Sequence, residues 1–237
     1  ATINEQIDRM RHSATRSLME RQDVIIVSSV SCIYGIGDVK TYSSMTAELQ
    51  VGQEIDIRTL MQRLIELQYN RNDISFVRGA FRVRGDTLEV FPSHSDDMAW
   101  RINFFGDEIE EIFEIDPLTG KKINQVKEIK LYANSHYVTP MPTIEQAIKG
   151  IKLELIDRVN ELEAAGKLIE AQRIQQRTTF DLEMLTATGM CQGIENYSRY
   201  LDGRAPGTRP FCLLDYFPDD YLMLVDESHV TIPQVHA

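Results

Sequence analysis

Two short apolar runs stand out along the chain, and both predict buried strands. Residues 221–225 carry no charge and stop abruptly at Asp226 and Glu227, while residues 24–27 lead into small polar residues. A short apolar run with polar boundaries is typical of a strand that is buried on both faces of a parallel sheet. The sequence therefore predicts such a sheet, with two acidic side chains at the carboxyl end of one strand.

A helix is predicted before the run at residues 24–27. Apolar residues between positions 3 and 20 recur at helical spacing, and Thr2 with Glu5 can form a capping box. A helix that leads into a buried strand is typical of an α/β fold.

After about residue 38 the pattern changes to that of an α+β domain. Asp56 can cap a helix whose apolar stripe runs through residues 57–67, and hairpins follow it. The clearest hairpin covers residues 80–91, with Gly85 and Asp86 as a two-residue turn.

Closing this hairpin at its turn fixes which side chains face each other. The predicted pairs are Phe81 with Val90, Arg82 with Glu89, Val83 with Leu88, and Arg84 with Thr87. Alternation along the strands then separates a core face from an outer face, which carries Arg82, Arg84 and Glu89. A second hairpin is predicted around Gly106 and Asp107, with Trp100, Ile102 and Phe104 alternating against Arg101 and Asn103.

The second half of the chain predicts a turn, a strand and two helices. Residues 116–120 form a turn that leads to a strand near residues 129–132. Thr143 with Gln146 can cap a long helix over residues 144–165, which Gly166 interrupts. A second helix over residues 167–185 can pair with the first as an antiparallel hairpin.

Composition limits the classes of function. The formal charge of -11 argues against binding nucleic acid by bulk electrostatics, so any DNA contact must be local. Cys32, Cys191 and Cys212 lack CxxC spacing, which favours a reducing compartment and buried thiols over a zinc site or a disulfide framework. No apolar run could cross a bilayer and the start lacks a signal-peptide pattern, so we expect no membrane partner and a cytoplasmic location.

Asp226 and Glu227 are the candidate catalytic residues. Ligands of open α/β sheets bind at the carboxyl ends of the strands, and in P-loop nucleotidases an aspartate there holds Mg²⁺. The position suggests Asp226 for Mg²⁺ and Glu227 for orienting or deprotonating a water molecule. The alternative is a solvated loop after a buried strand. The following Ser228 and His229 favour the first interpretation, because they complete the DExH signature of superfamily 2 helicases.

Two further observations concern ligands. No stretch satisfies the phosphate-binding pattern G-x-x-x-x-G-K-[ST], so we expect this chain alone to bind no ATP and to hydrolyse none. Five histidines are scattered along the sequence, and isolated histidines explain them without a metal cluster: His12, His94, His136, His229 and His236.

Several motifs together resemble the UvrB family of bacterial nucleotide excision repair. The strongest are DESHVTIPQ at 226–234, GIENYSR at 193–199 and FRVRG at 81–85. Supporting segments are SVSCIYG at 29–35, DPLTG at 116–120 and FDLEM at 180–184. The resemblance covers essentially the whole chain, which looks like an internal piece between the Walker-A loop and the later helicase motifs of the family.

The resemblance implies a fold and a function. Residues 1–38 and 139–237 would be two parts of a RecA-like ATPase domain, the second with long helices and the Walker-B strand. Residues 39–138 would be an inserted α+β domain that binds UvrA. The complete protein would use ATP and Mg²⁺, act as a helicase-like subunit, and verify lesions in damaged DNA before incision by UvrC.

Arginines on the predicted hairpin are the candidate partner-binding residues. Guanidinium groups match carboxylates at protein interfaces, although an exposed strand face satisfied by Glu89 and water is the alternative. The resemblance implies that Arg71, Arg82 and Arg84 belong to the polar contact with UvrA. Asn103 stands where the family often has an acidic residue, so we expect the contact to depend more on the arginines.

DNA contacts rest on the resemblance alone. Residues 193–201 mix aromatic side chains with an arginine, which suits a single-stranded nucleic acid as well as a packed surface loop. The resemblance implies that Arg11, Arg177 and Glu195 lie toward a DNA channel. A different class of function stays open: a non-catalytic UvrA-binding adaptor, like the UvrB-like region of transcription-repair coupling factors. The intact DExH signature argues against the adaptor.

Overall fold

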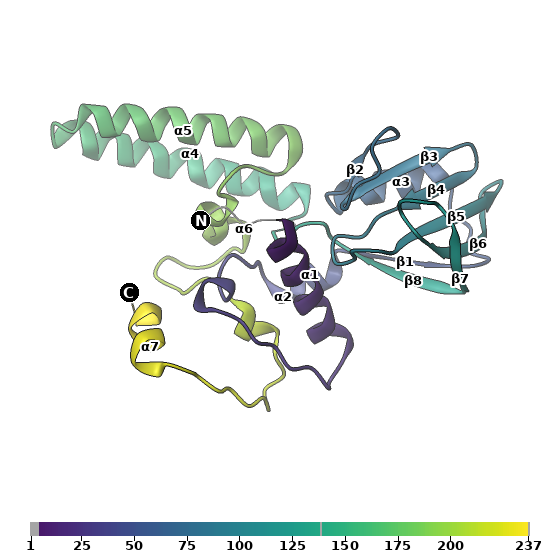
Figure 1. Cartoon of the computed structure of the whole chain (residues 1–237). Helices are drawn as coiled ribbons and strands as arrows, with labels where there is room; N and C mark the ends of the chain where they lie inside the picture. Colours follow the sequence, from purple (N-terminus) through teal and green to yellow (C-terminus); the bar gives the residue numbers. More distant parts are fainter. Residues whose placement is uncertain (1–4, 138, 237) are drawn as a thin grey trace. The chain divides into compact units, whose positions relative to one another are not determined.

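The structure is a computed structural model that describes residues 5–137 and 139–236. The chain divides into two compact units, one formed by residues 1–138 with 212–237 and the other by residues 139–211 (Figure 1). Among the described helices, none combines the length and the apolar character that crossing a membrane requires.

The first unit contains all of the described strands. Its helices are α1 (Glu5–Glu20), α2 (Val39–Ser44), α3 (Ile57–Glu66) and α7 (Ser228–His236), with two 3₁₀ turns, η1 (Val30–Cys32) and η3 (Leu213–Tyr216). Its strands are β1 (Thr46–Gln50), β2 (Asn70–Arg71), β3 (Ala80–Arg84), β4 (Thr87–Val90), β5 (Ala99–Phe105), β6 (Glu108–Ile115), β7 (Lys122–Val126) and β8 (Glu128–Tyr132).

These strands form two sheets. The larger has the order β2-β3-β4-β5-β6-β7, in which β2 and β3 are parallel and the other neighbours antiparallel. The smaller is an antiparallel ribbon of β1 and β8. Only Lys127 separates β7 in the first sheet from β8 in the second. The antiparallel order of the insert, predicted from its hairpins, is confirmed for all but the short β2.

One hydrophobic core joins α3, one face of the six-stranded sheet and the ribbon. Leu60 and Leu64 of α3 are completely buried against side chains of the sheet, which include Phe81, Leu88 and Ile102. Burial of each such side chain contributes roughly 1.5–3 kcal/mol. The core fixes which face of the sheet points inward, and therefore which face stays available on the outside.

The local predictions for this unit are largely confirmed. The carboxylate of Asp56 accepts hydrogen bonds from the backbone N–H groups of Arg58 and Thr59, so it caps α3 as expected. The β3–β4 hairpin has all four predicted cross-strand pairs. Its turn works because Gly85 adopts a φ of +59°, and Gly106 plays the same part between β5 and β6 with a φ of +62°.

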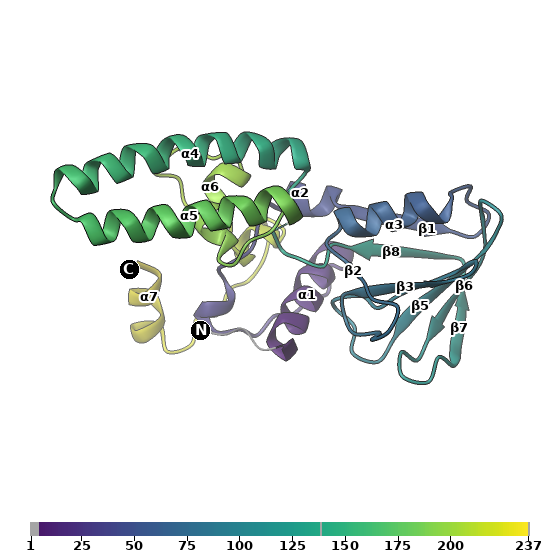
Figure 2. The same ribbon diagram turned by 90° about the horizontal axis from the view of Figure 1, so that it is seen from above.

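The second unit is helical. It contains α4 (Met141–Ala164), α5 (Leu168–Thr188), the 3₁₀ turn η2 (Ile194–Tyr197) and α6 (Ser198–Leu201). The helices α4 and α5 lie side by side as an antiparallel pair in both views, which confirms the predicted hairpin (Figures 1 and 2). The break between them is at Gly166, as predicted, with a φ of +73°.

The predicted cap of α4 is wrong, because the helix begins earlier than Thr143. Pro140 occupies the N-cap position without a side-chain hydrogen bond, and Pro142 lies in the first turn. Proline suits that turn because its missing N–H would have no helical acceptor there. The predicted capping box of Thr2 and Glu5 falls partly outside the described residues.

The two predicted buried strands are also wrong. Residues 221–225 pair with no other strand, and the side chain of Leu224 is 86% exposed. Residues 24–27 are likewise unpaired, with Ile25 92% exposed. A doubly buried parallel strand needs a strand on each side and a layer on each face. The described part of the chain supplies neither for these two segments.

Candidate docking groove

The outer face of the six-stranded sheet carries a row of charged side chains. Residues Arg82, Glu89 and Arg101 lie directly opposite one another on β3, β4 and β5. Side chains that are cross-strand neighbours on one face can contact each other. The register that buries the core on one side therefore gathers these three charges on the other.

Glu89 is the centre of this row, and the structure corrects its predicted exposure. It lies on the outer face as expected but is only 5% exposed, because Arg82 and Arg101 cover it. Nε of Arg82 donates to Oε2 at 2.5 Å, and Nε of Arg101 donates to Oε1 at 2.7 Å. A buried carboxylate requires such charge-assisted partners, since its removal from water is otherwise costly.

The two arginines of the hairpin differ in what holds them. The guanidinium of Arg82 lies 4.3 Å from the ring centroid of Phe76, so an aromatic face and a carboxylate fix it together. The side chain of Arg84 is exposed and makes no hydrogen bond or ion pair with any residue that the structure describes, although its charge still acts on Asp73. One arginine is thus preorganised, and the other is free to reach a partner.

These side chains line a shallow groove of about 410 Å³, called the basic groove below. Its lining residues are Arg82, Arg84, Thr87, Glu89, Arg101, Asn103 and Lys122. Four of the seven carry positive charge and one carries negative charge, against a net charge of -11 for the chain. Such a local excess complements an acidic protein surface.

Arg71 does not belong to the basic groove. It lies on β2 opposite Phe81, on the side of the sheet that faces α3, and its Nη1 contacts the sulfur of Met61 at 3.8 Å. Its Nε pairs with Asp73 at 2.9 Å. A hydrogen bond from the backbone N–H of Val83 lowers the pKa of Asp73 below its ordinary value, and the hydrogen bond from Arg71 lowers this pKa further. The structure therefore brings together Arg82 and Arg84 but leaves Arg71 at the edge of the sheet.

Two cations of the groove were missed as candidates from sequence. Arg101 could have been found by extending the predicted register by one strand, because it falls opposite Glu89. Lys122 gave no such signal, since it lies on β7, a strand that was not predicted. Its Nζ is 3.5 Å from the ring centroid of Phe113. Asn103 accepts from the hydroxyl of Thr87 and donates to Glu111, so it is satisfied within the sheet.

The candidate catalytic residues do not form an assembled site in this chain. Oδ1 of Asp226 accepts from the backbone N–H of Glu227, whose own carboxylate is 70% exposed. Glu227 has a φ of +47°, and its carbonyl accepts from two N–H groups at the start of α7. His229 places Nδ1 3.5 Å from Glu227, while Ser228 begins the helix. Two solvent-exposed carboxylates without further ligands do not fit a bound nucleotide or its Mg²⁺ here.

The three residues expected near DNA lie in different settings. Arg11 of α1 is used internally, since its Nη2 donates to the carbonyls of Tyr34 and Gly35. Arg177 of α5 keeps 68% of its side chain exposed and lies 3.8 Å from Asp181. Glu195 is exposed in the first turn of η2, and belongs to the same unit as Arg177.

Two of the five histidines, His12 and His136, are far apart in sequence but lie together in space. The rings of His12 and His136 stack with centroids 4.0 Å apart, and Asp8 offers an oxygen within 4.8 Å of both. This corrects the expectation of isolated histidines. Asp8 and His12 are four residues apart on α1, a spacing that places two metal ligands on one helix face and could have drawn attention.

The chemistry of this cluster favours a structural role over a metal site. Nε2 of His136 is 3.3 Å from the hydroxyl of Thr15, and Oδ2 of Asp8 is 3.4 Å from Nη1 of Arg78. The guanidinium of Arg78 would also repel a divalent ion. Burial lowers the pKa of His12 to about 4 and that of His136 well below 6.5, so both rings are neutral at pH 7.

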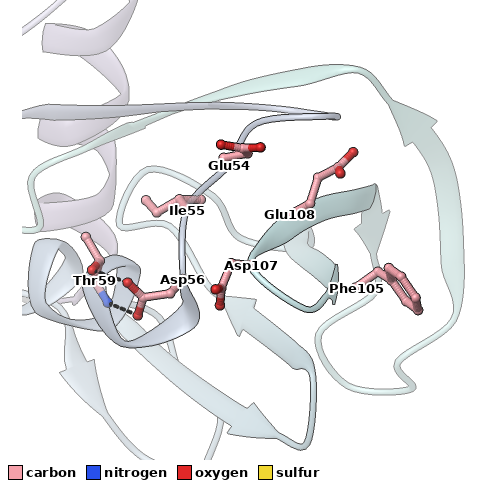
Figure 3. Close-up of a pocket in the computed structure, with 7 residues that line it drawn as sticks. All are labelled: Glu54, Ile55, Asp56, Thr59, Phe105, Asp107 and Glu108. Atoms are coloured by element: carbon pink, nitrogen blue, oxygen red, sulfur yellow. Dashed lines mark hydrogen bonds between the residues drawn. The ribbon is translucent and has the colours of Figure 1, made fainter.

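A second depression on this unit, of about 680 Å³, is acidic (Figure 3). Its lining includes Glu54, Asp56, Asp107 and Glu108, with Phe105 at the rim. Asp56 is already engaged there as the cap of α3. Unlike the basic groove, this depression contains no basic side chain among its lining residues, and nothing in it indicates a ligand.

Comparison with known proteins finds a family match within each unit. Residues 47–137 match the UvrB interaction domain, and residues 142–203 match the UvrB third helical domain. The basic groove lies wholly within the first match.

Curated relatives match the entire chain. It is 54% identical to the UvrABC system protein B of Syntrophotalea carbinolica, 55% to that of Clostridium botulinum and 54% to that of Geobacillus kaustophilus. Each alignment covers all 237 residues of this chain and 36% of the relative. From its two matched domains and an identity that holds along its full length, we conclude that the chain belongs to the UvrB family.

Proposed function

We propose that this chain is the central part of a B subunit of the UvrABC system, and that its basic groove docks onto UvrA in bacterial nucleotide excision repair. The observation that carries the proposal is the local excess of positive charge on a face that lies inside the matched interaction domain. An acidic surface of UvrA would complement it, with Arg82 and Arg84 as principal contacts. Arg71 would contribute from the sheet edge.

Capture of the purified chain by immobilised UvrA tests this proposal. Charge reversal in the double variant Arg82→Glu, Arg84→Glu should abolish capture, because four units of charge change at the groove. The matched control is Lys40→Glu, Arg58→Glu, which makes the same change at exposed positions on α2 and α3. Capture of a folded Arg82→Glu, Arg84→Glu variant at the level of the parent would reject the docking assignment.

A RecA-like ATPase domain is proposed for the complete protein. The apolar side chains exposed at Ile25, Val27 and residues 221–225 support it, since exposed apolar surface of this kind marks a face that another element covers. The relatives are long enough to supply those elements, because this chain spans 36% of their length. Asp226 would then bind Mg²⁺ with ATP, and Glu227 would act on the attacking water. Loss of ATP hydrolysis in full-length Glu227→Gln would support this role, and parent-level hydrolysis would refute it.

Lesion verification in damaged DNA and hand-over to UvrC are proposed for the complete protein as well. Among the residues proposed to face DNA, Arg177 has an accessible guanidinium, and Glu195 belongs to the same unit. The two hydrogen bonds of Arg11 favour an additional structural role. The names of the relatives that match along the whole of this chain favour a subunit of the UvrABC system over a non-catalytic adaptor.

A further inference from the structure

We propose that Glu89 is the positioning residue of the basic groove, which holds Arg82 and Arg101 ready for carboxylates on the partner. This inference rests on the docking function proposed above. The negative charge of Glu89 alone would repel carboxylates on the partner and weaken binding. The proposed role is the opposite, because Glu89 would strengthen binding by holding the arginines in place.

The geometry divides the carboxylate between the two arginines. Oε2 accepts from Arg82, and Oε1 accepts from Arg101 through Nε at 2.7 Å and Nη2 at 2.6 Å. Arg82 donates to Glu89 through Nε, and its two terminal nitrogens make no hydrogen bond with any residue that the structure describes. Arg101 keeps Nη1. A terminal pair of N–H donors is what a bidentate contact with a carboxylate requires.

Both guanidinium groups are also restrained from other directions. Phe76 supports Arg82 at 4.3 Å, and the turn before β7 confines Arg101, since a Cβ at Gly120 would lie 3.3 Å from its Nη2. The side chains of Arg82 and Arg101 are only 15% and 23% exposed. Long side chains fixed in advance lose less conformational freedom on binding, so the groove is preorganised.

Charge and position make opposite predictions for Glu89. Its carboxylate is the one negative group among the lining residues of the groove. If the groove attracted its partner by net charge alone, removal of this group would strengthen binding. If Glu89 positions the arginines, removal would release two guanidinium groups and weaken binding. The direction of the change therefore separates the two roles.

The decisive experiment compares Glu89→Gln with Glu111→Gln in binding to immobilised UvrA at two salt concentrations. Glu111 lies on the same face without contacting an arginine, so its variant removes the same charge and leaves the arginines in place. We expect Glu89→Gln to bind about tenfold more weakly, mainly through faster dissociation, and Glu111→Gln to bind as well as the parent or better. Equal or tighter binding by Glu89→Gln would overturn the proposal.

A second variant keeps the test decisive if Glu89→Gln fails to fold. Glu89→Asp preserves the charge and shortens the side chain by one methylene, so positioning predicts weaker binding and charge alone predicts parent affinity. Failure of the docking function itself would give a different result, because the Arg82→Glu, Arg84→Glu variant would then still bind UvrA. If only the positioning role failed, both Glu89 variants would bind with parent affinity and the Arg82→Glu, Arg84→Glu variant would not bind.

Discussion

Acidification should destabilise the first unit through His12. The ring is buried in α1 and stacks on His136, and burial outweighs the opposing influence of Asp8, while Arg78 and Arg11 lower the pKa further. Because the folded pKa lies below that of the unfolded chain, the unfolded state binds more protons in between. The contribution of His12 is therefore fully present above about pH 6.5 and is lost as the pH falls toward about 4.

The size of the effect follows from the pKa difference. A shift from 6.5 to about 4 corresponds to about 3 kcal/mol, at roughly 1.4 kcal/mol for each pKa unit. Urea unfolding between pH 7.5 and 4.5 can measure it through the fluorescence of Trp100, the one tryptophan of the chain, which is buried in the sheet. The free energy of unfolding should change little down to about pH 6.5 and then fall as the pH is lowered to 4.5.

Two variants isolate the contribution of His12. In His12→Gln the titrating ring is gone, so the dependence on pH should become shallower by up to about 3 kcal/mol across the range. His229→Gln is the matched control, because it removes an exposed histidine of α7. The ring of His94 lies with its centroid 6.0 Å from that of Trp100 in both variants, so its effect on the fluorescence is common to them. The role of His12 would be refuted if the free energy of unfolding of His12→Gln depended on pH as steeply as that of the parent. It would also be refuted if the parent were more stable at pH 4.5 than at pH 7.5.

Three further substitutions probe the fold. Ile102→Ala should lower the free energy of unfolding by about 2–5 kcal/mol, because the side chain is completely buried, and a loss below about 1 kcal/mol in urea titration would contradict the core assignment. Asp56→Ala should cost about 1 kcal/mol by removing the cap of α3, visible as a lower urea midpoint, and no change would show that the cap is dispensable. Gly79→Ala should cost about 1–3 kcal/mol, since φ is +78° and a Cβ would lie 2.6 Å from the amide of Asn134, and parent thermal stability would speak against this strain.

Sequence predicted best the elements whose causes are local. The register of the β3–β4 hairpin follows from a two-residue turn and alternation, and both lie within a dozen residues. The cap of α3 is equally local. β7 escaped notice because all of its residues are at least partly exposed and show no alternation. β1 alternates over only five residues, which is too short to stand out.

The failures share a dependence on distant parts of the molecule. An apolar run such as residues 221–225 becomes a buried strand only if other strands receive it, which its own residues cannot show. The burial of Glu89 depends on Arg101 from a third strand, and the stacking of His12 on His136 depends on a loop far along the chain. The division into ATPase and inserted domains and the roles of Asp226 and Glu227 stay predictions.

The single residue between β7 and β8 has a mechanical consequence. Lys127 is too short a tether to absorb slippage, so any shift of β7 along β6 would drag β8 along β1 by the same step. A one-residue step would turn Leu131 and Ile129 out of the interior and expose them to water. The β1–β8 ribbon thus restricts the register of β7 in the larger sheet, and insertion of a flexible linker at Lys127 should remove this restriction.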